Sequence, residues 1–124
     1  MRMTKRVAAA IATSAASVAM LLGATAVPAQ AATTVQGCRA GYVCIYPKNS
    51  WNGGHPFYQF LTYGAHNISN QYGMHRIFNN QTGGAKVYVC AGRNGTKCYT
   101  PGQPAFTYMD INLTPINSVK LASK

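Results

Sequence analysis

The chain has 124 residues, of which 48% are hydrophobic, and carries eleven lysine and arginine residues against one acidic residue, Asp110. A single carboxylate excludes the paired acids of a glycosidase-type site, and it leaves only Asp110 as the possible acid of a Ser-His-Asp triad. The composition therefore indicates a binding protein and not an enzyme.

Residues 1–31 have the layout of a secretory signal peptide. The basic start MRMTKR precedes an Ala-rich apolar run, and Ala29-Gln30-Ala31 fits the small-x-small cleavage rule. A membrane anchor is the competing interpretation, because the run is about long enough to span a bilayer, although it consists mostly of Ala, Ser and Thr. Cleavage after Ala31 leaves residues 32–124 as one secreted, extracellular domain of 93 residues without stable membrane insertion.

The mature chain is strongly basic. It keeps eight lysine and arginine residues against Asp110, a net charge of +7. Such an excess favours acidic partners such as cell-wall polymers, anionic lipid or an acidic protein surface, and export from the cell argues against nucleic acid. Alternatively, the scattered charge only keeps a small extracellular protein in solution.

The mature chain contains four cysteines, Cys38, Cys44, Cys90 and Cys98. In an oxidising compartment they predict two disulfides, for which three connectivities exist. Local pairing, Cys38 with Cys44 and Cys90 with Cys98, is favoured because each pair flanks a turn and the two halves of the chain resemble each other. Each bridge would contribute about 2–3 kcal/mol through loop-closure entropy. Zinc binding is the competing interpretation, but the spacings are poor for it.

The first predicted strand spans residues 42–46. Tyr42, Cys44 and Tyr46 alternate with Val43 and Ile45, which is the pattern of a half-buried strand.

The rest of the first half is expected to contain one more long strand and one short strand. Lys48–Gly54 is a turn-rich loop that carries the only tryptophan, Trp51, and an Asn-Gly reversal. His55–Gly64 is an aromatic strand that suits packing of one sheet on another. Ala65–Arg76 has no clean period and is expected to be an ordered connection with one helical turn, followed by a short strand at Ile77–Phe78.

The second half repeats the first. Residues 79–84, NNQTGG, are interpreted as the join, and Tyr-Val-Cys recurs at 88–90 in a strand that begins at Lys86. The remaining segments are expected to be an aromatic strand at 105–109, an irregular link at 110–115 and a closing strand at 116–121. The pattern predicts an all-β sandwich of two four-stranded units with no helix of three turns.

The double motif between Gln36 and Leu121 resembles a βγ-crystallin Greek-key domain, with a first motif at about 36–84 and a second at about 85–122. More narrowly, the leader, the paired local cysteines, GYVCIY and KVYVC…C resemble the secreted actinobacterial metalloproteinase inhibitors of peptidase inhibitor family 36. The resemblance implies a monomeric, secreted peptidase inhibitor whose partner is an extracellular, thermolysin-like metalloprotease.

In that family the reactive bond follows the first cysteine of the second disulfide, which here is Cys90-Ala91, with Gly92 and Arg93 next in the loop. A rigid loop enters a protease cleft with little ordering cost, and a disulfide across the bond retains the cleaved ends. Two features depart from the family. The seven-residue loop is longer than in the best-known member, and Ala91 offers a thermolysin-type pocket less apolar surface than a branched residue would.

The alternative function is a secreted cationic binding or antimicrobial module that recognises cell-wall polysaccharide or a membrane surface. Trp51, Tyr46 and Tyr58 beside Lys48 would form its aromatic, cationic ligand patch. If the tyrosines instead fill the sandwich, only Trp51 is exposed.

No metal or other cofactor is expected. His55, His66 and His75 lack the spacing of a zinc motif. Calcium prefers six to eight hard oxygens, but residues 71–76 break the calcium signature of βγ-crystallins. In the second motif only Asn117 and Ser118 fit it.

Overall fold

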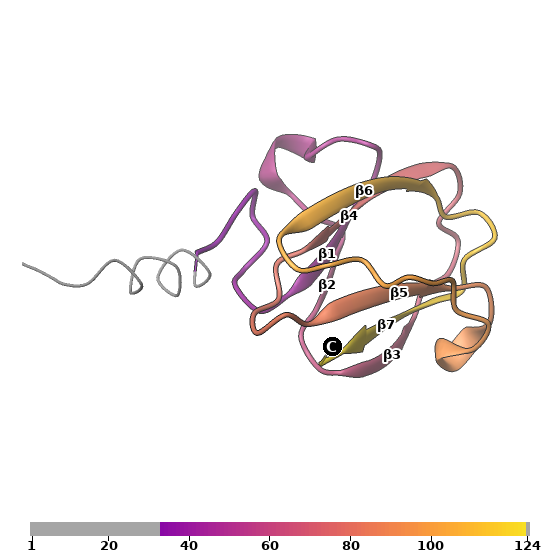
Figure 1. Ribbon diagram of the computed structural model, residues 1–124. Helices are drawn as coiled ribbons and strands as arrows, with labels where there is room; N and C mark the ends of the chain where they lie inside the picture. The colour runs from indigo at the N-terminus through magenta and orange to yellow at the C-terminus, as the bar shows by residue number, and fades with distance from the viewer. Residues whose placement is uncertain (1–32, 124) are drawn as a thin grey trace, which may run out of the picture. The chain divides into compact units, whose positions relative to one another are not determined.

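The computed structural model describes residues 33–123, so the predicted signal peptide lies outside the described part (Figure 1). Within it the strands are β1 (Val43–Tyr46), β2 (Tyr58–Phe60), β3 (Gly64–Asn67), β4 (Met74–Asn79), β5 (Lys86–Cys90), β6 (Thr107–Asn112) and β7 (Ser118–Ala122). Two short 3-10 turns, η3 (Asn52–Gly54) and η4 (Arg93–Gly95), are the helical elements of this part. Among residues 33–123 no helix has the length and hydropathy to cross a membrane. The predicted all-β fold is confirmed.

The strands form two antiparallel sheets in which the halves of the chain exchange strands. The order is β2-β1-β4-β6 in one sheet and β3-β7-β5 in the other, so β3 completes the sheet of the second half and β6 completes that of the first. The expected two units of four strands are wrong for the second sheet. There the segment after Cys98 meets β5 only at the isolated bridges Val87–Gln103 and Cys90–Cys98. The connections are consistent with two Greek-key motifs.

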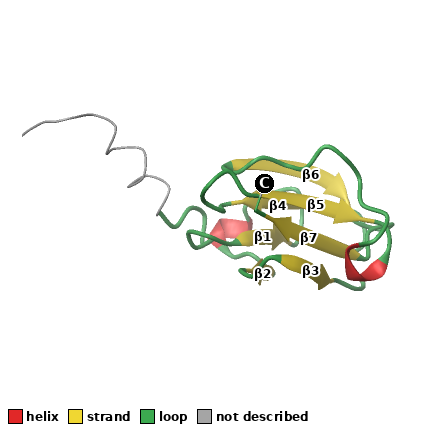
Figure 2. Cartoon of the chain, turned by 60° about the horizontal axis from the view of Figure 1, so that its bottom comes forward, coloured by secondary structure: helices red, strands yellow, loops and turns green. Residues whose placement is uncertain are grey.

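The two sheets pack face to face around an aliphatic core. Viewed in Figure 2, β5 and β6 lie along one edge of this sandwich, whereas β2 and β3 lie along the other. The buried side chains come from both sheets and from the links: Val43, Ile45, Ile68, Ile77, Val87, Val89, Leu113, Ile116, Val119 and Leu121.

Strand β1 is buried on both faces, so the prediction of a half-buried strand is wrong. Val43 and Ile45 belong to the core between the sheets, whereas Cys44 and Tyr46 belong to a second apolar cluster on the outer face of their sheet. The loop that carries Trp51 folds back over this face and packs against the cluster. Burial of the outer face therefore depends on a segment that strand periodicity cannot reveal.

The predicted irregular connections are partly strand. Residues 65–76 contain most of β3 and the start of β4 and no helical turn, β6 continues to Asn112, and the closing strand begins at Ser118. The reason is pairing between the halves: Asn67 lies opposite Ser118, and Met74 lies opposite Asn112. These segments become strands because of partners from the other half.

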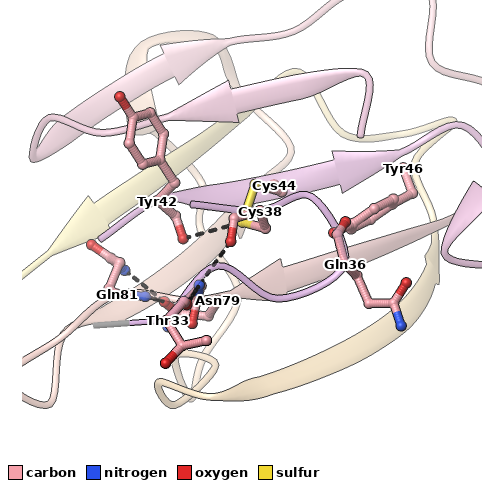
Figure 3. The surroundings of a disulfide bond; sticks show 9 residues. Thr33, Gln36, Cys38, Tyr42, Cys44, Tyr46, Asn79 and Gln81 are labelled. Carbon is pink, nitrogen blue, oxygen red and sulfur yellow. Dashed lines mark hydrogen bonds between the residues drawn. A yellow bond between two sulfur atoms is a disulfide. The ribbon is translucent and has the colours of Figure 1, made fainter. Parts of the chain in front are cut away.

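The amide run at 79–81, interpreted from the sequence as a join, is buried and holds the halves together. Asn79 Nδ2 donates to the carbonyl oxygens of Ala85 and Gln103 at 3.1 and 3.0 Å. Asn80 Nδ2 donates to those of Thr33 and Cys38 at 3.0 and 2.9 Å. This network fixes the N-terminal segment beside the first disulfide (Figure 3).

Candidate functional site

Both predicted disulfides, Cys38–Cys44 and Cys90–Cys98, are present. The loop enclosed by the second one, residues 91–97, leaves the end of β5 and contains η4, which packs against β3 and β7 (Figure 1). The sequence-predicted protease-binding residues therefore lie at one end of the three-stranded sheet.

The loop is a tight hairpin. Ala91 N donates to Lys97 O at 2.9 Å and Gly92 N donates to Thr96 O at 3.0 Å. Gly92 is required by space, because a Cβ atom there would collide with the Thr96 side chain. At the turn, Asn94 has φ 58°, a left-handed conformation that asparagine adopts more readily than most residues.

Side chains of β3 and β7 hydrogen-bond to the loop. Asn67 of β3 donates to Asn94 Oδ1 at 2.8 Å and accepts from Asn94 N at 2.7 Å. Ser118 Oγ donates to Gly92 O at 2.6 Å and accepts from Gly95 N at 3.0 Å. The loop is thus part of the folded sheet and not a free flap.

Asn117 spans the Cys90-Ala91 bond. Its backbone N–H donates to Cys90 O at 3.0 Å, and its side-chain Nδ2 donates to Ala91 O at 2.8 Å. One residue therefore holds the carbonyl groups on both sides of this peptide bond. The sequence suggested only a remnant calcium position for Asn117, because nothing local indicates a contact 26 residues away.

The loop divides into a buried base and an exposed tip. Cys90 is fully buried and Ala91 and Gly92 are half-buried, whereas Arg93, Asn94, Thr96 and Lys97 are exposed. The loop contains no acidic residue. Its tip therefore presents two cations on a rigid backbone.

The predicted ligand patch of Trp51, Tyr46 and Lys48 does not form as expected. Tyr46 is fully buried, and its hydroxyl donates to Gln36 O at 2.9 Å, which Figure 3 shows beside the first disulfide. Burial raises the pKa of Tyr46 to about 12. Trp51 is half-buried with its ring edge-on to Tyr46 and Phe78, and Lys48 is exposed. Tyr46 is therefore a structural residue, and the predicted patch is wrong in that respect.

Sequence reasoning missed a cluster on the same face. The guanidinium of Arg76 lies 4.6 Å from the ring centre of Trp51 and 4.2 Å from that of Tyr108. It donates to both oxygens of Asp110 at 2.8 and 3.0 Å, and this hydrogen bonding holds the pKa of Asp110 below its usual value. A lone acid in a basic chain predicts a cationic partner, but no local signal indicates which one.

The three histidines lie on separate segments. His55 follows η3 and is exposed, His66 Nε2 lies 2.7 Å from Thr62 O, and His75 Nδ1 lies 3.0 Å from Gly73 O. Among residues 33–123 no three His, Cys, Asp or Glu side chains gather as a metal site.

No family model, curated protein or solved structure matches the chain.

Proposed function

We propose that the protein is a secreted inhibitor of an extracellular, thermolysin-like metalloprotease and that the Cys90–Cys98 loop contacts the enzyme. The observation that carries the proposal is the pair of hydrogen bonds by which Asn117 spans the Cys90-Ala91 bond. A loop already fixed by a disulfide and by scaffold side chains loses little conformational entropy on binding.

The same geometry would retain both ends of a cleaved bond. Hydrolysis adds water across Cys90-Ala91 and leaves a carboxylate on Cys90 and an amino group on Ala91. Cys90 stays in β5 and bonded to Cys98, and its carboxylate keeps the Asn117 N–H as a donor. Ala91 keeps its bond from the Asn117 side chain. The ends cannot separate, so the enzyme remains occupied by a product that it does not release.

The exposed tip is the surface that an enzyme meets first. The N–H groups of Ala91 and Gly92 already donate within the hairpin, so contact begins at Arg93 and Lys97. Their charges favour an enzyme with an acidic rim around its cleft.

An inhibition assay tests this proposal. Thermolysin is incubated with the purified protein and its activity on a peptide substrate is measured. Arg93→Ala and Lys97→Ala are expected to weaken inhibition, whereas Lys48→Ala, which removes an exposed cation outside the loop, leaves it unchanged. Absence of inhibition at micromolar protein refutes the proposal.

A second candidate function is recognition of cell-wall polysaccharide by the outer face of the four-stranded sheet. Tyr108 is 51% exposed and lies 4.9 Å from Trp51, beside the Arg76–Asp110 pair. Aromatic rings flanked by polar groups suit a sugar ring. In a pull-down on chitin or peptidoglycan, Tyr108→Ala should reduce binding and Tyr63→Ala, at a 60% exposed tyrosine outside this cluster, should not. If the polysaccharide retains Tyr108→Ala and Tyr63→Ala equally, the outer face of the four-stranded sheet is not the binding surface.

A further inference from the structure

One edge of the sandwich is open. Between β6 and the segment beside β5 lies a groove of about 460 Å³, with Val87, Val89, Met109 and Ile111 as its floor and Tyr99 and Tyr108 at its rim. No charged side chain lines it. It is about three times as large as a cavity of roughly 150 Å³ that holds benzene.

The opposite edge shows what closes such a gap in this fold. There Tyr58 and Phe60 of β2 lie opposite Ile45 and Val43 and pack on the core. The rings of Tyr58 and Phe60 are stacked with centres 5.4 Å apart, and His66 of β3 stacks on Phe60 at 4.5 Å. Three planar rings thus fill the space between the edge strands of the two sheets.

The groove lies where those rings have no counterpart. Gln103, not an aromatic residue, lies opposite Val87, and β6 contributes Met109 in place of a ring. Gln103 Nε2 is fixed by the carbonyl oxygens of Ile77 and Thr107 at 3.1 and 2.8 Å, and its Oε1 is buried without a hydrogen-bond partner. The edge therefore combines an apolar floor with one unsatisfied acceptor, which is costly unless a donor satisfies it.

The net positive charge of the domain favours an anion. Residues 33–123 carry seven lysine and arginine residues against Asp110, which is already paired with Arg76. The Arg76 guanidinium also lies on the ring of Tyr108, at the rim of the groove. From the stacked rings at the closed edge and this excess of positive charge, we propose that the groove binds a planar aromatic molecule of about two rings that carries a negative charge.

Titration with two matched probes tests this proposal. Anilinonaphthalene sulfonate and uncharged N-phenylnaphthylamine share a ring system and an N–H donor, and their fluorescence reports transfer out of water. The anion is expected to bind at one site and more tightly than the neutral probe at low salt, with the difference shrinking as salt is added.

A variant whose groove is filled by a larger side chain tests whether the probe binds in the groove. Met109→Trp places a ring where the groove now is and should weaken binding of the anion by about tenfold or more. Met74→Trp adds the same ring at a 46% exposed methionine of β4 outside the groove and should leave binding unchanged. If Met109→Trp fails to fold, Ile111→Phe serves as the filling variant. Equal affinities of the filled and control variants, absence of saturable binding, or tighter binding of the neutral probe at low salt would each overturn the proposal.

Discussion

The two disulfide loops use the same covalent link and differ in how much of each is exposed: Arg39 is the one exposed residue within the first loop, whereas Arg93, Asn94, Thr96 and Lys97 are exposed in the second. Cys38 and Cys44 are both fully buried, within a cluster that includes Tyr46 and Phe78. The loop of Cys90–Cys98 instead ends in an exposed tip that carries Arg93. A disulfide closes both loops, so closure alone does not create a functional surface.

An asparagine anchors each loop through backbone and side chain together. Asn80 N donates to Tyr42 O at 2.9 Å while its side chain donates to Cys38 O. Asn117 donates in the same two ways to Cys90 O and Ala91 O. Asn80 is buried and Asn117 is exposed. The first anchor therefore contributes mainly to stability, and the second positions a loop that a partner can reach.

Removing the disulfides should give the largest difference between the loops. Cys38→Ala with Cys44→Ala should lower the free energy of unfolding by about 3–5 kcal/mol, because loop-closure entropy and buried contacts are both lost. Cys90→Ala with Cys98→Ala should cost about 2–3 kcal/mol and abolish inhibition. Urea unfolding followed by fluorescence gives both values. If the two double variants lose the same free energy of unfolding and the Cys90→Ala/Cys98→Ala variant still inhibits, the proposed difference between the two loops is wrong.

Replacing each anchoring asparagine by alanine, Asn80 in one variant and Asn117 in another, separates an effect on stability from an effect on function. Asn80→Ala should cost about 2–3 kcal/mol, because it removes a buried side-chain amide together with its hydrogen bonds to the carbonyl oxygens of Thr33 and Cys38. Asn117→Ala removes one exposed hydrogen bond and should cost about 1 kcal/mol, but the loop should be cut faster by the protease. Thermal unfolding and mass spectrometry of digests measure the two effects. An Asn117 variant that resists cleavage as long as the native protein contradicts the assigned role.

High pH should lower the free energy of unfolding through Tyr46, which packs in the same buried cluster as the first disulfide. Below pH 10 its phenol is protonated in the folded and unfolded chains alike, so its contribution to stability is complete. Because burial raises the pKa in the folded state to about 12, ionisation of the unfolded chain removes about 2–3 kcal/mol between pH 10 and 12.

The control for this pH effect is Tyr46→Phe. It loses the hydrogen bond to Gln36 and about 1 kcal/mol at neutral pH, but its unfolding free energy should fall less between pH 10 and 12. Parallel curves for the two proteins would show that Tyr46 is not the titrating group.

The smallest effect on stability is expected at the tip. Arg93→Ala and Lys97→Ala should change the free energy of unfolding by less than about 0.5 kcal/mol, since both side chains are exposed. Any larger loss in denaturant titrations would mean that these residues support the loop and do not merely occupy its surface.

Local signals in the sequence were sufficient for the strands with apolar alternation and for the disulfides. They predicted β1 and β5 from the Tyr-Val-Cys repeat, and they favoured the local cysteine pairs that the structure contains. They did not predict β3, whose GAHN sequence has little strand propensity and becomes a strand by pairing with β7.

The tertiary contacts of the site could not be predicted from the sequence either, because they also join residues that are far apart in the chain. Asn67 and Asn117 reach the loop from 27 and 26 residues away, and amides in polar stretches look like turn residues. Residues 79–84 do connect the two halves as expected, but the burial of the amides at 79–81 was not predicted, because their acceptors include Gln103 and Thr33, 24 and 47 residues distant. Hydrogen bonds of this kind leave no periodic pattern.

Amide hydrogen exchange of the protein bound to thermolysin tests the central claim most directly. If the Cys90–Cys98 loop is the inhibitory surface, exchange slows at residues 92–97 and stays unchanged around Cys38–Cys44. Slowing around Trp51 or the first disulfide, with residues 92–97 exchanging as in the free protein, would contradict the account.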